Sequence, residues 1–205
     1  MVINRTIGKA MQQVLNKLGM LKWLWITLVM LILDQATKQI ALHTLEWYTA
    51  VPVLPHLNWY LTENPGAAFS FLSTAGGWQR WFFTIVALVV STALVFWLKG
   101  LKPQERYSAI GIAFILSGAL GNVIDRIIYG HVIDFIQFYY SSAQSCLWGF
   151  SYYREAVGAE CIWPAFNVAD SAITIGAAFL ILELIIDAVR RQKHKAAQDL
   201  EHGTK

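Results

Sequence analysis

The sequence predicts an all-α membrane protein: four transmembrane helices with a small extracytoplasmic β-sheet or loop cradle. Of its 205 residues, 56% are hydrophobic and only 14% are charged, whereas about 25% of a typical soluble domain is charged. Four apolar stretches are long enough to cross a bilayer as helices, which takes about 20 residues each. Basic residues also gather on one side of the resulting topology, as the positive-inside rule requires.

Few charges interrupt the predicted spans. The apolar centres of the second and third contain none, whereas the first runs into Asp34 and Lys38 and the fourth contains Glu183 and Asp187. We assign Glu183 to a local contact near the cytoplasmic end of its helix. The four spans cover about residues 21–42, 81–98, 108–126 and 167–189.

The distribution of basic residues sets the orientation. Twelve of the 16 Lys and Arg residues precede the first span, separate the second from the third, or follow the fourth. Both termini are therefore predicted to be cytoplasmic, and loops 43–80 and 129–165 to face outward. The net charge of +3 is accounted for by this orientation and by anionic lipid headgroups, so no nucleic-acid partner is expected.

The regions outside the spans are short. Residues 1–19 are predicted to be a cytoplasmic extension, either a helix on the membrane surface or a disordered segment. The first apolar run continues to Asp34 with no small-x-small cleavage site, so we interpret it as a retained anchor rather than a signal peptide. Residues 20–190 form the predicted membrane domain, and residues 191–205 a basic cytoplasmic tail.

The chain has two cysteines, Cys146 and Cys161, and both fall in the second outer loop. In an oxidising compartment they could form a disulfide, worth roughly 3 kcal/mol in the chain-entropy picture. Two free thiols are the alternative, and the sequence leaves both open. No further Cys or His accompanies them at ligand spacing, so a metal site is not expected.

Polar residues collect near the outer ends of the spans. The first span runs outward, and Asp34 lies 13 residues past Leu21, or ~20 Å along a helix. The inner ends carry no comparable group, so a site here would open outward or into the outer leaflet. The residues at this depth are Asp34, Lys38, Asn122, Asp125, Arg126, Asp134, Asn167 and Asp170.

Three of these residues have structural explanations that involve charge pairing. Asp34 and Lys38 are four residues apart on one helix and could form an ion pair with no other role. Asp125 is unfavourable at the C-terminal end of a helix. We therefore expect it to pair with Arg126, with Lys38 or with a backbone group, in a structural role.

Asp134 and Asp170 point to a paired-carboxylate site. Asn167 could cap the fourth span, with Asp170 at the third helical position. Asp134, in contrast, lies in a short apolar run where a solvated charge is not expected. The two aspartates are 36 residues apart, and the loop between them starts and ends on the same side of the membrane. Two such carboxylates can share one proton and perform acid–base chemistry.

Small residues predict close contact between the third and fourth spans, which two neighbouring carboxylates would need. They are Ser117, Gly118, Ala119 and Gly121 in the third span and Gly176, Ala177 and Ala178 in the fourth. In the first outer loop, apolar and polar residues alternate from Leu57 to Thr62, which is typical of a short strand.

Five motifs, in this order, resemble those of the bacterial lipoprotein signal peptidases, the signal peptidase II family. The resemblance covers roughly residues 20–190. The motifs are Leu33-Asp34-Gln35-Ala36-Thr37-Lys38, Asn64-Pro65-Gly66-Ala67-Ala68-Phe69, Gly121-Asn122-Val123-Ile124-Asp125-Arg126, Val132-Ile133-Asp134-Phe135 and Phe166-Asn167-Val168-Ala169-Asp170-Ser171.

The resemblance implies an aspartic peptidase of the bacterial inner membrane, without cofactor or metal. We expect a monomer, although the sequence itself does not determine the oligomeric state. Its substrates would be prolipoproteins whose lipobox cysteine carries diacylglyceryl, cut just before that cysteine, with membrane lipids as the surrounding partners. Asp134 and Asp170 would be the catalytic pair. The residues implied to line or support the site are Asn64, Asn122, Arg126, Asn167, Asp34, Lys38 and Asp125.

The chain departs from the family pattern between the two aspartates, where about residues 141–162 form an extra stretch that contains both cysteines. The motifs on either side are intact, so the predicted activity stands, but the way in which this loop covers the site stays open.

Three other classes of protein compete with the aspartic peptidase. A proton-coupled transporter would carry polar residues through the whole membrane depth. A serine–lysine peptidase could combine Lys38 with Ser70 or Ser171, but no G-x-S-x-G signature is present. An Mg²⁺-dependent enzyme acting on lipid phosphates could use Asp and Asn ligands, and chelation would reveal it.

Overall fold

The structure is a computed structural model that describes residues 19–66, 76–141, 146–147, 150–155 and 158–202. Within these ranges four helices are long and apolar enough to cross a membrane, which confirms the predicted fold class. The predicted extension is outside the described residues except for Gly19. The helical elements are η1 (Gly19–Trp23), α2 (Leu24–Thr44), α3 (Gln79–Gly100), α4 (Arg106–Ile128) and α5 (Val168–His202).

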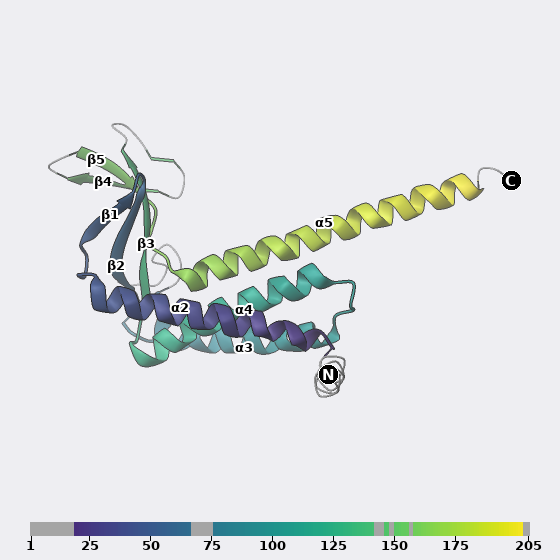
Figure 1. Ribbon diagram of the computed structural model, residues 1–205, viewed down its shortest axis with the longest axis horizontal. Coiled ribbons are helices and arrows are strands. Elements are labelled where there is room, and N and C mark those ends of the chain that lie inside the picture. Colours follow the sequence, from purple (N-terminus) through teal and green to yellow (C-terminus); the bar gives the residue numbers. More distant parts are fainter. Residues whose placement is uncertain (1–18, 67–75, 142–145, 148–149, 156–157, 203–205) are drawn as a thin grey trace, which may run out of the picture.

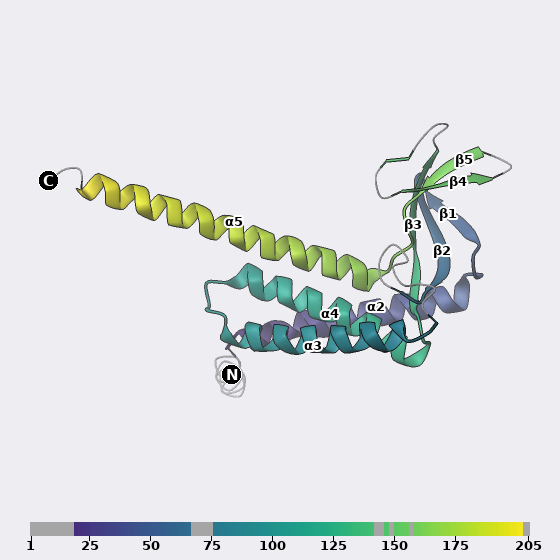
Figure 2. The ribbon, with the colours of Figure 1, turned by 180° about the vertical axis from the view of Figure 1, so that it is seen from behind.

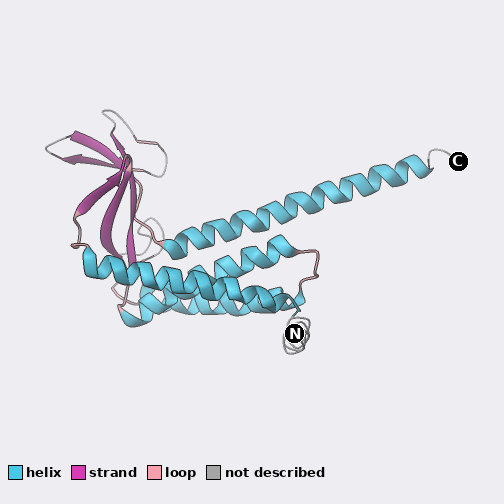
Figure 3. Ribbon diagram, viewed as in Figure 1, coloured by secondary structure: helices cyan, strands magenta, loops and turns pink. Residues whose placement is uncertain are grey.

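The helices α2, α3 and α4 lie side by side, and the sheet stands at one end of them (Figures 1 and 3). The helix α5 starts beside the sheet, packs along α4 and then extends past the bundle, as the view from behind also shows (Figure 2). It continues through most of the predicted basic tail as one helix. With 35 residues it is about 52 Å long, well beyond the ~30 Å of a hydrocarbon core.

Two apolar clusters hold this arrangement together. At the end of the bundle far from the sheet, Met20 and Leu98 pack against Ile112 and Leu116 of α4. At the other end, Ala41 of α2 packs against residues of the sheet, including Leu61 and Ile133. The second cluster fixes the sheet on the helices, because fully burying an aliphatic side chain contributes about 1.5–3 kcal/mol.

The described strands form one antiparallel sheet in the order β1-β2-β3-β5-β4. The predicted strand from Leu57 is confirmed as part of β2. In the central pairing, Thr62 of β2 lies opposite Asp134 of β3, so the sheet places this aspartate at its helix-proximal end. The strands are β1 (Ala50–Leu54), β2 (Leu57–Asn64), β3 (Val132–Ser141), β4 (Ser151–Glu155) and β5 (Gly158–Ile162).

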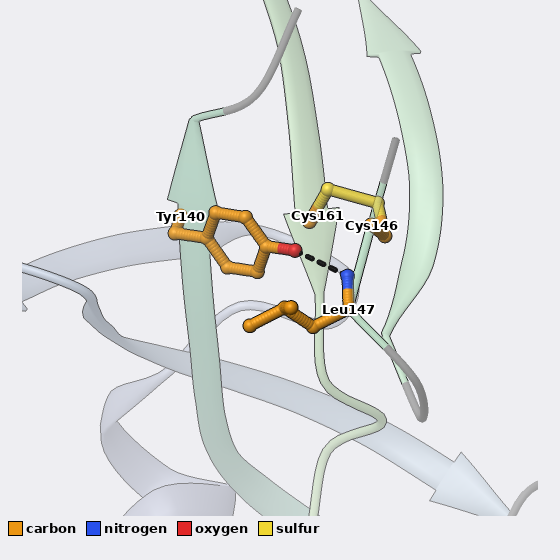
Figure 4. Close-up of a disulfide and its surroundings, with 4 residues drawn as sticks. All are labelled: Tyr140, Cys146, Leu147 and Cys161. Carbon is orange, nitrogen blue, oxygen red and sulfur yellow. Dashed lines mark hydrogen bonds between the residues drawn. A yellow bond between two sulfur atoms is a disulfide. The ribbon is translucent and has the colours of Figure 1, made fainter. Parts of the chain in front are cut away.

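The extra stretch between the two aspartates extends the sheet. Strand β5 pairs with the far end of β3, where Tyr140 lies opposite Cys161. Cys161 is buried and bonded to Cys146, so the structure has the disulfide rather than two free thiols. Beside it, the Leu147 N–H donates a hydrogen bond to the Tyr140 hydroxyl (Figure 4). These contacts make the described part of the stretch an ordered continuation of the sheet.

Glu183 makes the local contact predicted for it, although the form of that contact was not foreseen. Its side chain is buried, and its carboxylate accepts hydrogen bonds from the backbone N–H groups of Tyr107 (3.0 Å) and Ser108 (3.2 Å). These N–H groups belong to the first turn of α4, where no intrahelical acceptor exists and the helix dipole favours a negative charge. Glu183 therefore ties α5 to the start of α4, at the end of the helices far from the sheet.

Glycines bring α4 and α5 into backbone contact, as the small residues predict. A Cβ atom added to Gly111 would lie 2.7 Å from the carbonyl oxygen of Gly176, and one added to Gly118 would collide with the carbonyl of Ala169. The second contact lies one residue before Asp170. Close packing of the two helices thus sets the position of the N-terminal turn of α5.

Replacing Gly118 by alanine is therefore expected to destabilise the protein. Overpacking of this kind typically costs about 1–3 kcal/mol, which corresponds to a loss of about 5 °C in the unfolding midpoint Tm. The measurement is thermal unfolding in detergent. Gly100→Ala is the matched control, because a Cβ at Gly100 meets no atom within 4 Å. Equal midpoints for the two variants would contradict the packing argument.

Candidate active site

The predicted site residues meet where the helices contact the sheet. They come from α2, β2, α4, β3 and the start of α5, and hydrogen bonds, ion pairs and electrostatic contacts connect all of them. These residues are Asp34, Lys38, Asn64, Asn122, Asp125, Arg126, Asp134, Asn167 and Asp170.

Asp134 is enclosed, with only 1% of its surface exposed. One carboxyl oxygen accepts a hydrogen bond from the Asn64 amide (3.0 Å), and the other accepts one from the Asn167 amide (2.7 Å). Burial and, after it, the nearby charge of Asp170 together raise the pKa of Asp134 to about 8, because both disfavour the charged form. At neutral pH Asp134 therefore holds a proton.

Asp170 lies in the first turn of α5 and is only partly buried. As predicted, Asn167 caps this helix: its side-chain oxygen accepts the Asp170 N–H (3.0 Å), and the Asp170 carboxylate accepts the Asn167 N–H (3.2 Å). This reciprocal arrangement is a capping box. It uses only one carboxylate oxygen, and the other accepts a hydrogen bond from the Asn122 amide (2.9 Å).

Asn167 joins the two aspartates. Its amide nitrogen donates to Asp134, whereas its amide oxygen accepts the backbone N–H of Asp170. The side chain is fully buried. The helix dipole at the start of α5 favours a negative charge on Asp170, while the apolar surroundings of Asp134 favour its neutral form. Two carboxyl groups that differ in this way can act as a base and an acid on one substrate.

Arg126 supplies a positive charge near both aspartates. Its guanidinium interacts electrostatically with Asp170 and Asp134. It donates to the backbone carbonyls of Gly66 (2.8 Å) and Asn122 (3.4 Å). Its Nε atom is buried without a hydrogen-bond partner among the described residues. A developing negative charge on a substrate carbonyl would be stabilised by such a group.

A buried ion network lies beside the aspartate pair. The Lys38 ammonium is 2.9 Å from the carboxylate of Asp34 and 2.8 Å from that of Asp125, and it also donates to Asn122 (3.2 Å). Asp125 additionally accepts the backbone N–H of Ile133 (3.1 Å). Of the partners left open for Asp125, the structure thus shows Lys38 and a backbone group.

Gln35 belongs to this network and was missed in the sequence. Its side-chain amide donates to Asp34 (3.1 Å), to Asp125 (3.0 Å) and to the carbonyl of Gly121 (3.3 Å). The signal that could have identified it is its position three residues before Lys38, which places both side chains on one helix face.

No group of three or more His, Cys, Asp or Glu side chains suited to a metal ion occurs in the part of the chain that the structure describes. Metal independence stays a prediction, which the chelation experiment below tests.

A protein-family model described as signal peptidase (SPase) II matches residues 26–186. Among curated relatives, a lipoprotein signal peptidase of Pseudomonas aeruginosa PAO1 is 45% identical over 189 residues, which are 92% of this chain and 98% of that protein. Another, from Alteromonas mediterranea, is 43% identical over 178 residues, 87% of this chain and 88% of its own length.

Two solved structures are also similar, and both are described as bacterial membrane enzymes. One aligns with a TM-score of 0.65 at 31% identity and covers 82% of this chain and 89% of its own. The other has a TM-score of 0.61 at 30% identity, with 80% and 92% covered. The sequence match spans all four helices and the sheet that carries Asp134. The chain therefore belongs to the signal peptidase II family, the lipoprotein signal peptidases.

Proposed function

We propose that this protein removes signal peptides from prolipoproteins as an aspartic endopeptidase, with Asp134 and Asp170 as the catalytic pair. The substrate carries diacylglyceryl on its lipobox cysteine, and the bond before that cysteine is cut. Family membership supports the removal of signal peptides from prolipoproteins. The observation that carries the catalytic assignment is the pairing of a buried, protonated Asp134 with a helix-capping Asp170 through Asn167.

In the proposed reaction Asp170 takes a proton from a water molecule, whose oxygen attacks the scissile carbonyl carbon. Asp134 gives its proton to the carbonyl oxygen, so the tetrahedral intermediate is neutral. The intermediate then returns that proton to Asp134 as the carbonyl re-forms and the C–N bond breaks. Asp170 gives its proton to the leaving amine. Arg126 stabilises the negative charge that develops on the carbonyl oxygen.

The proposed setting is the bacterial inner membrane, with both termini in the cytoplasm and the site near the outer face. The excess of Lys and Arg at the ends far from the site supports this orientation. Large apolar side chains are open to lipid along α3 and α5: Val89, Phe96 and Leu184 are 64–70% exposed. Residues 20–190 are the proposed catalytic domain, acting as a monomer, and residues 191–205 a basic tail.

Cleavage of a purified prolipoprotein in detergent tests the function. We expect cleavage of the diacylglyceryl-modified form before its cysteine, at the same rate with excess EDTA. The matched unmodified precursor is the control for the lipid requirement, and we expect at least tenfold slower cleavage of it. If folded protein leaves a substrate that a known peptidase accepts uncut, the peptidase assignment fails. Loss of activity in EDTA, restored by Mg²⁺, would favour a metal-dependent enzyme.

The raised pKa of Asp134 also predicts how activity depends on pH. The group must be protonated to act as the acid, and it is protonated below its pKa of about 8. The value of kcat is therefore expected to be nearly constant well below this pH, to bend near it, and to fall tenfold per pH unit well above it. A pH profile of cleavage between 6 and 10, with unfolding monitored in parallel, checks this. Full activity at pH 10 in folded enzyme would contradict it.

A further inference from the structure

Two buried carboxylates outside the catalytic pair hold the backbone directly before each catalytic aspartate. Asp34 accepts the N–H of Ala169 at 2.9 Å, one residue before Asp170. Asp125 accepts the N–H of Ile133 at 3.1 Å, one residue before Asp134. The residue before each catalytic aspartate is therefore hydrogen-bonded, through its backbone N–H, to a carboxylate on α2 (Asp34) or α4 (Asp125).

Two side chains of α2 link these two carboxylates to each other. Lys38 contacts both, at 2.9 and 2.8 Å, and neutralises charge. The amide nitrogen of Gln35 also contacts both, at 3.1 and 3.0 Å, but adds no charge. An amide NH₂ group has two donor hydrogens, enough for one hydrogen bond to each carboxylate; the carbonyl of Gly121, at 3.3 Å, is the longest of its three contacts.

We propose that Gln35 is a positioning residue that, together with Lys38, sets the separation of Asp134 and Asp170. This inference rests on the proposed function, because it concerns the same pair of aspartates. The path from Gln35 runs through Asp34 to Ala169 on one side and through Asp125 to Ile133 on the other. A displacement of about 1 Å at a reacting group can cost 10²-fold in rate. A residue that sets the positions of the two aspartates can therefore affect the rate without contacting the substrate.

The role of Gln35 can be tested separately from folding, because Lys38 and not Gln35 supplies the positive charge of the network. Gln35→Met keeps a side chain of similar length and helix propensity but removes both donors. Lys38 still contacts both Asp34 and Asp125, so neither of the two buried ion pairs is broken. The expected consequence is a looser link between the two carboxylates, not loss of the fold.

We expect Gln35→Met to lower kcat for the lipidated prolipoprotein by about 10- to 100-fold, with KM changed less than twofold. The matched control is Gln39→Met, one turn along the same face of α2. Gln39 makes one described side-chain hydrogen bond, to the Tyr129 hydroxyl at the end of α4 (2.7 Å), and no contact with the two carboxylates. It is expected to keep kcat within twofold.

A second readout distinguishes positioning from general destabilisation and does not require cleavage. The charged groups that act on Asp134 are Asp170, Arg126 and Lys38. If Asp170 moves away, its repulsion weakens and Asp134 loses its proton at lower pH. Infrared titration of the protonated carboxyl band, assigned by its absence in Asp134→Asn, should show a midpoint lower in Gln35→Met than in wild type and Gln39→Met.

The outcomes separate cleanly. A lowered midpoint together with reduced kcat supports the positioning role. An unchanged infrared midpoint overturns it, whether kcat falls or not. A lower kcat accompanied by a lower Tm would then reflect destabilisation of the protein. If wild-type protein cleaves no prolipoprotein, the proposed function fails, but the infrared midpoints still decide whether Gln35 controls the spacing.

Discussion

Replacing either Asp134 or Asp170, the proposed catalytic pair, by asparagine is expected to abolish cleavage, with kcat lowered by about 10³-fold or more, while the protein still inserts and folds. Asn at position 134 cannot donate a proton to the carbonyl oxygen, and Asn at position 170 cannot accept one from water. Each step depends on one proton transfer that contributes up to about 10⁴-fold. The measurement is single-turnover cleavage of a lipidated prolipoprotein by Asp134→Asn and Asp170→Asn.

Folding is followed in the same preparations by thermal unfolding in detergent. Asp187→Asn is the control substitution on α5, because Asp187 is paired only with Arg190 (3.5 Å) in the described residues and is partly exposed. It should cleave at the wild-type rate. Turnover within tenfold of wild type in either Asp134→Asn or Asp170→Asn would remove the aspartate pair from the mechanism.

The largest expected effect on stability comes from Lys38. Its side chain is fully buried and is the cation shared by Asp34 and Asp125. Lys38→Met leaves two carboxylates facing each other in a low-dielectric site without a counterion. Breaking a buried pair in this way costs about 3–5 kcal/mol, equivalent to a fall of roughly 6–20 °C in Tm for a chain of this size. Activity should be lost as well.

Two further variants show whether unpaired charge is the cause. Lys22→Met removes a lysine from an exposed position and should leave Tm unchanged. The triple variant Lys38→Met/Asp34→Asn/Asp125→Asn removes all three charges and should recover part of the lost stability, since a neutral network has no unpaired ion. A Lys38→Met protein that unfolds at the wild-type temperature would contradict the shared-cation interpretation.

The helices could be predicted because their signal is local. Long apolar runs and the placement of basic residues are sufficient for four spans, and the alternation after Leu57 is sufficient for β2. The predicted pairing of Asp134 with Asp170 depended on one argument, the cost of a carboxylate beside an apolar segment, and the structure brings both residues to Asn167. Their catalytic role stays a prediction that the asparagine variants test.

What the sequence did not predict depends on contacts between distant segments. Strand β3 begins Val132-Ile133-Asp134-Phe135-Ile136, an apolar run broken by one residue, which lacks the period of two that marks a half-exposed strand. Strands β4 and β5 form by pairing with each other and, through β5, with β3, and the spacing of the cysteines left their disulfide open. Gln35 contacts Asp125, which is 90 residues away; its position on the same helix face as Lys38 could indicate that it belongs to the network, but not that Asp125 is its partner.

The hydrogen bond from Ala169 to Asp34 joins the first and last of the four described membrane helices, 135 residues apart. This bond has a consequence for biosynthesis. As the chain is made from its N-terminus, α2, α3, α4 and the strand with Asp134 all emerge before α5. Asp170 and its cap exist only when α5 has entered the bilayer and docked. On the proposed mechanism, a chain that has not yet added α5 therefore carries one aspartate of the pair and no peptidase activity.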